Sequence, residues 1–433
     1  MAFWFFLRMA LVFLLRVATL AFVFEWFWMA LQGFRESYSR KKVNALIVFF
    51  FTIYVILIIK LITIEEIGNG IFFATYSVAV SFYILSRFAL AYIYRPQNEV
   101  FDTRYVPTIS FGVPSKNEGD AIRETILRIA QSDYPKEKFN IIAVNDGSDD
   151  NTLSEMMLAK QDAGRMGIEV IVVDWENNKG KREGMAECIR RSVNDIIVFI
   201  DSDSFVEKNT ARELVKYFIH PEVAAVAGHA FVTNANTNFL TKMQDVRYYV
   251  AFKAYKSAEA LFGCVTCCSG CCSAYRRSFL LEVLDPWLRQ SFLGVTCTYG
   301  DDRSLTNFLL RKGYKTMFAP DAIAYTAVPD TFRKFMRQQL RWKKSWVRES
   351  LLAGKFIWKR NPIVSVSFYL SVILPILAPV VVFRALIWYP TVTGLLPWFY
   401  IFGLALMALA YGLYYYIYVG DRKWIYGVFF AAF

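Results

Sequence analysis

The sequence IIVFIDSDS, residues 196–204, is a continuous apolar run followed at once by an alternation of Asp and Ser. Such a run is typical of a strand that is buried on both faces of a parallel sheet. The acidic turn follows where the strand ends, and parallel sheets bind their ligands beyond the carboxyl ends of their strands. This stretch therefore predicts an α/β domain with an acidic site at one sheet edge.

Short apolar segments and amphipathic segments alternate on both sides of this stretch. This alternation predicts a parallel sheet with helices on both faces. The predicted strands are residues 109–113, 140–144, 169–174, 196–200 and 224–227. The predicted helices are residues 121–132, 151–164, 182–192 and 211–219.

The composition predicts membrane segments around this domain. Hydrophobic residues make up 56% of the chain and are concentrated at its two ends. The net charge of +12 suits nucleic acid, an anionic membrane surface or a phosphorylated substrate. Because many basic residues flank apolar segments and no nucleic-acid motif is present, we favour membrane lipids and an anionic substrate as partners, and no nucleic acid.

Four apolar segments are long enough to cross a bilayer: residues 45–63, 71–94, 363–386 and 398–419. Residues 3–34 either span or lie in the interface, and residues 424–433 are expected to begin a truncated helix. Basic loops indicate a multi-pass plasma-membrane protein whose middle domain is cytoplasmic. The predicted divisions are 1–96 (membrane), 107–330 (catalytic domain), 331–361 (interfacial helices) and 362–433 (membrane).

Three acidic turns carry the predicted chemistry. They are Asn145-Asp146-Gly147-Ser148, Asp201-Ser202-Asp203 and Gly300-Asp301-Asp302-Arg303. A turn with Asp201 and Asp203 can offer carboxylate oxygens to Mg²⁺ or Mn²⁺, which keep further positions for phosphate oxygens. Any one such turn could instead only cap a helix. Three of them at predicted strand ends favour a metal and nucleotide site.

Two further segments fit a phosphorylated sugar donor. In NNKGKR, residues 177–182, Lys181 and Arg182 open a predicted helix whose N-terminus suits a diphosphate, although a solvated basic loop looks the same. Gln338, Arg341 and Trp342 share one face of a second predicted helix. Arg341 could neutralise a leaving diphosphate and Trp342 could stack on a sugar ring. An interfacial amphipathic helix has the same pattern.

Five of the seven cysteines lie in CVTCCSGCC, residues 264–272. Reduced thiols are expected in a cytoplasmic domain, so we do not predict a disulfide framework. Adjacent Cys pairs are poorly spaced for tetrahedral zinc. Small residues packed beside a substrate path are the favoured interpretation.

In their order along the chain, these motifs resemble those of processive, membrane-embedded family 2 glycosyltransferases, and hyaluronan synthases most of all. The similar segments are NDGS (145–148), NKGKR (178–182), DSDS (201–204), CSG with YRRS (268–278), FLG with CTYGDDRSLTN (292–307) and QQLRWKKSWVRES (338–350). The resemblance implies a GT-A-like catalytic domain between transmembrane helices.

The resemblance also implies a role for each motif. Asp146 and the 113–118 segment, with Pro114, Ser115 and Glu118, would bind the uridine, and Lys181 would lie nearby. Asp201 and Asp203 would bind the metal–diphosphate. Asp302 would be the general base. The donor and acceptor sites would be completed by Gln338, Arg341, Trp342, Cys268 and Asp301.

The implied reaction is inverting transfer from UDP-GlcNAc and UDP-GlcA to a growing polysaccharide, which the protein secretes. Two departures leave the product open. Gly270-Cys271-Cys272 replaces the Gly-Pro-Leu of hyaluronan synthases, and their Trp-Gly-Thr-Arg segment is missing. The alternatives are a chitin-type GlcNAc synthase, a transferase of single sugars to a lipid carrier, and a transporter with a nucleotide-sensing domain.

Overall fold

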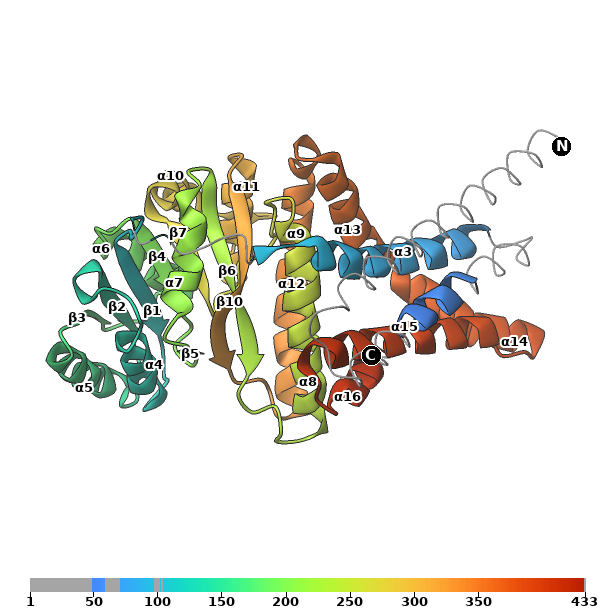
Figure 1. Ribbon diagram of the computed structural model, residues 1–433, viewed down its shortest axis with the longest axis horizontal. Helices are drawn as coiled ribbons and strands as arrows, with labels where there is room; N and C mark the ends of the chain where they lie inside the picture. The colour runs from blue at the N-terminus through green and yellow to red at the C-terminus, as the bar shows by residue number, and fades with distance from the viewer. Residues whose placement is uncertain (1–48, 59–70, 97–101, 103, 432–433) are drawn as a thin grey trace. The chain divides into compact units, whose positions relative to one another are not determined.

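The computed structural model describes residues 49–58, 71–96, 102 and 104–431 (Figure 1). The described chain divides into two compact units. One contains residues 49–89, 242–250 and 367–431, and the other contains residues 90–241 and 251–366. The predicted segment 3–34 lies outside the described residues. The second unit contains all the predicted site residues, and we call it the catalytic unit.

An eight-stranded mixed sheet forms the centre of the catalytic unit, in the order β3-β2-β1-β4-β7-β6-β10-β5. The strands are β1 Ile109–Ser115, β2 Phe139–Asp146, β3 Glu169–Trp175, β4 Ile196–Phe199, β5 Phe205–Val206, β6 Val223–Val232, β7 Ser273–Arg276 and β10 Lys315–Thr326. A separate hairpin joins β8 Ser291–Phe292 to β9 Val295–Thr296. All five predicted strands are therefore confirmed.

The first half of the sheet follows the predicted parallel arrangement. Strands β3, β2, β1 and β4 are mutually parallel. Every residue of β1 and β2 is buried, because helices cover both faces, and this explains why apolar residues predominate in both strands. Strand β3 lies at the edge, where exposed, half-buried and buried residues are mixed.

The second half of the sheet departs from the prediction of an all-parallel sheet. Strand β7 is antiparallel to both β4 and β6, and β5 is antiparallel to β10. The four residues of β7 follow directly after the cysteine-rich loop. A strand this short shows no alternation that sequence patterns detect.

Helices pack on both faces of the sheet. They are α4 Ala121–Ala130, α5 Thr152–Arg165, α6 Lys181–Arg191, α7 Thr210–Val215, α9 Ser257–Ala260, α10 Arg277–Leu288, α11 Asp301–Arg311 and α12 Phe332–Gly354, with short turns at η2 Lys136–Lys138, η3 Lys216–Ile219 and η5 Ile357–Lys359 and a π-helix η4 at Ala251–Lys256. Helix α4 buries Ile122, Ile126 and Ile129 at helical spacing in the core shared with α5 and α7. Cys188 of α6 faces Gly112 on the other side of β1.

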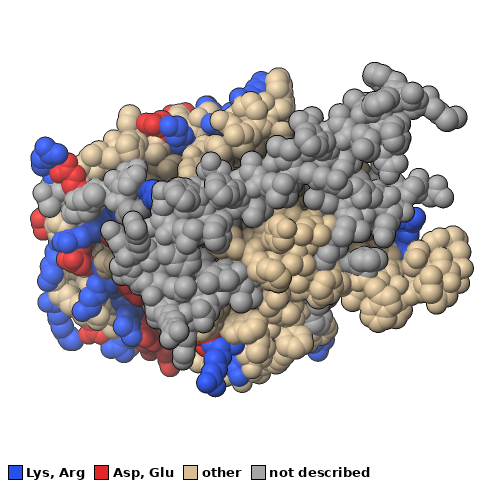
Figure 2. Space-filling model, turned by 45° about the vertical axis from the view of Figure 1, so that its right-hand side comes forward, with Lys and Arg blue, Asp and Glu red and all other residues tan. Residues whose placement is uncertain are grey.

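The other unit is helical. Its elements are the helix Phe49–Ile58, most of α3 Ile71–Ile93, α8 Phe239–Val250, α13 Pro362–Phe383, the π-helix η6 Arg384–Trp388, α14 Tyr389–Thr393, α15 Trp398–Val419 and α16 Trp424–Ala431. Among the described residues, three helical stretches are long and apolar enough to cross a membrane: Thr75–Ile93, Pro362–Thr393 and Tyr400–Val419. In Figure 2, charged side chains gather over the sheet-containing unit, whereas the helical unit shows mostly uncharged residues.

Within the helical unit, α8 is attached to the last helices by a partly buried ion pair. Lys423 Nζ lies 2.8 Å from Asp245 Oδ2, and the Tyr415 hydroxyl donates to the same oxygen at 3.3 Å. Gly412 allows α15 and α16 to touch, because a Cβ there would lie 2.6 Å from the Trp424 carbonyl oxygen.

Candidate active site

The carboxyl ends of β1 and β4 bring three acidic side chains together. Asp201 and Asp203 follow β4, and Glu118 follows β1. Glu118 accepts a hydrogen bond from the Ser202 hydroxyl at 2.8 Å. Desolvation raises the pKa of Glu118, and the charges of Asp203 and Asp201 raise it further against that hydrogen bond. The three carboxylates therefore form one electrostatic group.

Asp203 remains exposed at the rim of this group. Its pKa is nevertheless raised, first by partial loss of water and then by the charge of Asp201. Like-charged carboxylates this close favour a cation between them, and oxygen donors suit Mg²⁺ or Mn²⁺. Asp201 and Asp203 thus fit a divalent ion. Among the described residues, no group of three or more His, Cys, Asp or Glu side chains could hold a metal, so the remaining ligands would be water or substrate oxygens.

Asp146 shapes the neighbouring basic loop. Its two carboxylate oxygens accept the backbone N–H groups of Lys179 at 2.6 Å and Gly180 at 2.9 Å. Gly147 permits this approach, because a Cβ there would lie 2.7 Å from the backbone of Asn178. The described role of Asp146 is to hold the loop that begins α6, and its contact with uridine stays a prediction. Pro114 and Ser115 are buried at the end of β1.

Lys181, the first residue of α6, forms an ion pair with Asp201. Although desolvation opposes its charge, the pKa of Lys181 is raised by Asp201, with smaller contributions from Asp302 and Asp301. Lys181 therefore lies in the field of both the β4 turn and the α11 turn. A cation in this place can neutralise a diphosphate held at the acidic edge.

The cysteine-rich loop lies beside Asp201 because of the register of β7. Ser273 pairs with Phe199, so the residues that precede β7 emerge at the edge where β4 ends. A Cβ on Gly270 would lie 2.9 Å from Asp201 Oδ1, so only glycine leaves this carboxylate its space. All seven cysteines are free thiols. Cys268 is buried, and its backbone N–H donates to the Thr306 hydroxyl at 3.0 Å.

Asp302 meets the same loop from the other side. The Cys267 thiol donates a hydrogen bond to Asp302 Oδ2 at a sulfur–oxygen distance of 3.6 Å. Burial raises the pKa of Cys267 to about 12, and the charge of Asp302 contributes, so the donor is a neutral thiol. The charges of Asp201 and Asp302 both raise the pKa of Cys271 beyond the effect of its burial. The structure therefore gathers the β4 turn, the cysteine-rich loop and the start of α11.

Arg182 differs from its expected position. We grouped it with Lys181 for the diphosphate, but it is buried and its Nε donates to Asp301 Oδ1 at 2.7 Å. Its Nη1 donates to the Trp287 carbonyl oxygen at 3.0 Å. Arg182 therefore connects α6 to the α11 turn, because successive helical residues point in different directions. Asp301 is 8% exposed in this pair, and its proposed contact with the acceptor stays a prediction.

Gln338, Arg341 and Trp342 lie on α12, where a helix was predicted. Gln338 is half-buried, Trp342 is 37% exposed and Arg341 is exposed. Within the described part of the chain, no hydrogen bond or ion pair joins Arg341 to the acidic residues. Its place in the site depends on the helix that carries it. A Cβ on Gly300 would overlap the Ser345 side chain, so α12 packs directly on the Asp302 turn.

Sequence reasoning missed a buried polar cluster behind this turn. Its members are Gln290, Ser304, Asn307, Arg348 and Glu349, all no more than 8% exposed. The spacing of the residues on α12 could have revealed this cluster. Arg348 and Glu349 follow Arg341 and Trp342 by seven residues, which is two helical turns, so the four residues share one helical face.

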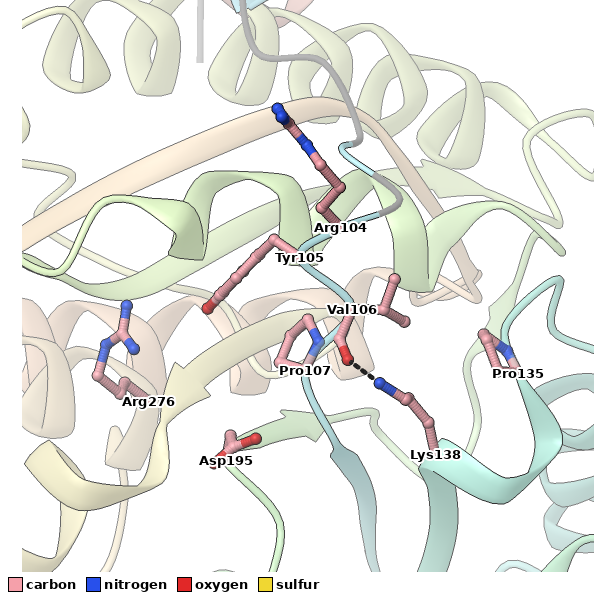
Figure 3. Close-up of a pocket in the computed structure, with 8 residues that line it drawn as sticks. All are labelled: Arg104, Tyr105, Val106, Pro107, Pro135, Lys138, Asp195 and Arg276. Carbon is pink, nitrogen blue, oxygen red and sulfur yellow. Dashed lines mark hydrogen bonds between the residues drawn. The ribbon is translucent and has the colours of Figure 1, made fainter.

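A cavity of about 570 Å³ lies at the opposite sheet edge (Figure 3). It contains none of the predicted site residues. Its polar groups join the segments that precede β1, β2 and β4. Lys138 Nζ donates to the Val106 carbonyl oxygen at 2.8 Å, and Thr108 Oγ1 donates to Asp195 at 2.9 Å. Arg276 donates to three backbone carbonyl oxygens. The candidate site is therefore the carboxyl edge.

Two family models match the chain. "Glycosyltransferase like family 2" matches residues 107–345, and "Chitin synthase" matches residues 295–432. Among solved structures, the mannosyltransferase PcManGT from Pyrobaculum calidifontis, in complex with GDP-Man and Mn²⁺, superposes with a TM-score of 0.55 at 22% identity, over 82% of this chain and 97% of that one. This likeness shows the GT-A-like fold.

Two kinds of curated relative share more sequence. An N-acetylglucosaminyltransferase of Rhizobium meliloti is 36% identical over 256 residues, which are 59% of this chain and 59% of that protein. The hyaluronan synthase of Streptococcus pyogenes is 33% identical over 329 residues, 75% of each chain. Together with the family model that matches the whole sheet-forming region, this similarity means that the chain belongs to glycosyltransferase family 2.

Proposed function

We propose that this protein is an inverting, processive synthase that polymerises UDP-sugars into a β-linked, hexosamine-containing polysaccharide, with hyaluronan as the product. The observation that carries the proposal is the meeting of Asp201, Lys181 and Asp302 around the cysteine-rich loop. One side of this arrangement suits a charged nucleotide donor. The other side offers a carboxylate for the acceptor hydroxyl.

In the proposed reaction, Asp302 takes the proton of the acceptor hydroxyl as its oxygen attacks the anomeric carbon. The new carbon–oxygen bond forms as the bond to the diphosphate breaks, and UDP leaves with the electron pair. Lys181 and the N-terminus of α6 stabilise the charge that develops on the diphosphate. A divalent ion held by Asp201 and Asp203 would supply further positive charge there. Trp342 would cover the sugar ring.

We also propose that the apolar helices form a multi-pass anchor in the plasma membrane and pass the product outward. Their length and composition support this. On α12, the exposed apolar residues Leu340, Val347 and Leu351 stand among basic residues. This pattern supports a helix on a lipid surface, with the catalytic unit in the cytoplasm.

A second product is favoured by a specific observation. The Gly270-Cys271-Cys272 sequence lies against Asp201, where it would border the acceptor. The relatives that are N-acetylglucosaminyltransferases make a chitin-type GlcNAc product the alternative. Transfer of a single sugar to a lipid carrier is the remaining same-fold possibility.

The test is to incubate the purified protein with Mg²⁺ or Mn²⁺ and each UDP-sugar, singly and in pairs, and to measure product size. Polymer formed only with UDP-GlcNAc and UDP-GlcA together supports hyaluronan. Polymer from UDP-GlcNAc alone establishes the chitin-type reading, and a single-sugar lipid product rejects processive synthesis. Release of no UDP from any of the sugars would reject the glycosyltransferase proposal.

A further inference from the structure

Glu349 is a buried carboxylate that the proposed reaction does not use. It lies in the last third of α12 and is 1% exposed. Three side-chain donors reach its two oxygens: Gln290 Nε2 at 3.0 Å, Arg348 Nε at 2.8 Å and Asn307 Nδ2 at 2.9 Å. A buried charge is costly unless it is paired and hydrogen-bonded, and this one is fully engaged.

The partners of Glu349 surround the catalytic turn. Gln290 accepts from the Ser304 hydroxyl at 2.5 Å, and both Ser304 and Asn307 belong to α11, which begins with Asp301 and Asp302. Arg348 Nη2 donates to the carbonyl oxygen of Tyr299, one residue before Gly300. The cluster therefore forms hydrogen bonds with the chain both before and after Asp302.

The same cluster fixes the helix that carries Gln338, Arg341 and Trp342. Arg348 and Glu349 lie two turns beyond Arg341 and Trp342 on a continuous helical face. Gly300 has φ +79° and lies against Ser345, so the turn and α12 are in direct contact. One buried carboxylate thus joins the two elements whose relative position the proposed transfer requires.

We propose that Glu349 is a positioning residue that holds the Asp302 turn in register with α12. This inference rests on the proposed function for its kinetic consequence, and its structural consequence stands independently. Glu349→Gln removes the charge that Arg348 requires and turns one acceptor into a donor toward Gln290. The turn then loses its constraint from α12, while the Lys181–Asp201 ion pair and the contacts of Asp146 with the basic loop remain.

The experiment compares Glu349→Gln with the full-length wild-type protein in detergent. Misplacement of reacting groups by about 1 Å can cost about 100-fold in rate, so we expect kcat to fall by about 10- to 100-fold. The KM for UDP-sugar should change by less than about twofold, because the donor contacts are untouched. Amide hydrogen exchange of the peptide that spans residues 299–307 should accelerate.

Two further variants separate positioning from a general loss of folding. The exchanged pair Gln290→Glu with Glu349→Gln keeps one carboxylate and one amide in the cluster, and should recover most of the lost kcat and exchange protection. Glu282→Gln is the matched control, because Glu282 is an exposed acceptor for the Tyr314 hydroxyl, and neither residue belongs to the cluster. It should leave kcat and exchange unchanged.

The outcomes distinguish this inference from the proposed function. Unchanged hydrogen exchange in Glu349→Gln overturns the inference, as does a rise in KM with kcat preserved or a failure of the exchanged pair to restore protection. If the wild-type protein transfers no sugar, the proposed function falls. The exchange measurements still decide whether Glu349 holds the turn.

Discussion

The two halves of the catalytic sheet differ in strand direction and in where their functional residues come from. The half with β3, β2, β1 and β4 is parallel, and its functional residues follow directly after strands. The half with β7, β6, β10 and β5 is mixed, and the residues it contributes come from loops and helix ends. In the proposed function, the first half would offer charges to a donor, and the second would offer Asp302 and the cysteine-rich loop to an acceptor.

The difference teaches that acidic side chains of the parallel half follow directly after strands, whereas the Asp302 turn is held by side chains of other elements. Asp146 and Lys181 lie close to the strand and helix that position them. The turn with Asp302 is held indirectly, because Gln290 bonds to Ser304 of α11 and to Glu349 of α12. Substitutions in the two halves should therefore affect different measurable quantities.

The largest effect is expected from Asp302→Asn. Loss of a general base typically lowers a rate by about 100- to 10,000-fold, and we expect kcat to fall within that range. Binding of UDP should persist, because the donor half keeps its contacts. Calorimetric UDP titration and sugar incorporation measure the two quantities, with Asp285→Asn on the exposed face of α10 as the control. Polymer synthesis at the wild-type rate would remove Asp302 from this role.

Asp301→Asn tests the connection between the halves. It leaves the buried Arg182 guanidinium without its carboxylate, and breaking a buried pair costs about 3–5 kcal/mol of unfolding free energy. We expect the lower end of that range, because Asn still accepts one hydrogen bond. Chemical denaturation is the measurement. The control Glu222→Gln breaks an exposed pair with Lys315 and should leave stability unchanged. Equal stability of the two variants would contradict the conclusion that the Arg182–Asp301 pair joins the two halves.

The donor half should bind Mn²⁺ in a pH-dependent way. Protons compete with the metal for Asp203, and its raised pKa places this competition above the usual Asp value of about 4. Affinity should therefore be full at neutral pH and decline as the pH falls through the raised pKa, by up to about tenfold per pH unit. Mn²⁺ titrations at several pH values between about 7 and about 4.5 measure how this affinity changes. Asp203→Asn should bind more weakly and with a flatter profile, and an unchanged profile would exclude Asp203.

The smallest effect is expected from Gly270→Ala, where the halves touch. The added Cβ would press on Asp201 Oδ1 and shift it, at a cost of about 1–3 kcal/mol. We expect the KM for the UDP-sugar to rise about tenfold. Gly164→Ala is the matched control, because its Cβ would meet no atom within 4 Å. Equal KM values for the two variants would show that Asp201 does not require this space.

The parallel half of the fold was predictable because buried central strands leave short segments rich in apolar residues in the sequence. β1, β2 and β4 were found in this way, as was the position of the acidic turn after β4. The antiparallel insertion of β7 was not predictable, because four residues carry no period and their pairing is decided by β4 and β6. The prediction of an entirely parallel sheet was wrong for that reason.

The sequence by itself determined the apolar segments, the strand–helix alternation and the family-like motifs, because each depends on neighbouring residues. Only the tertiary structure decided that Arg182 turns away from Lys181 to pair with Asp301, and that Glu349 joins α12 to the Asp302 turn. Partners of this kind are selected by burial and hydrogen-bond geometry across long sequence separations. A linear pattern of residue types holds no information on which buried donor meets which buried acceptor.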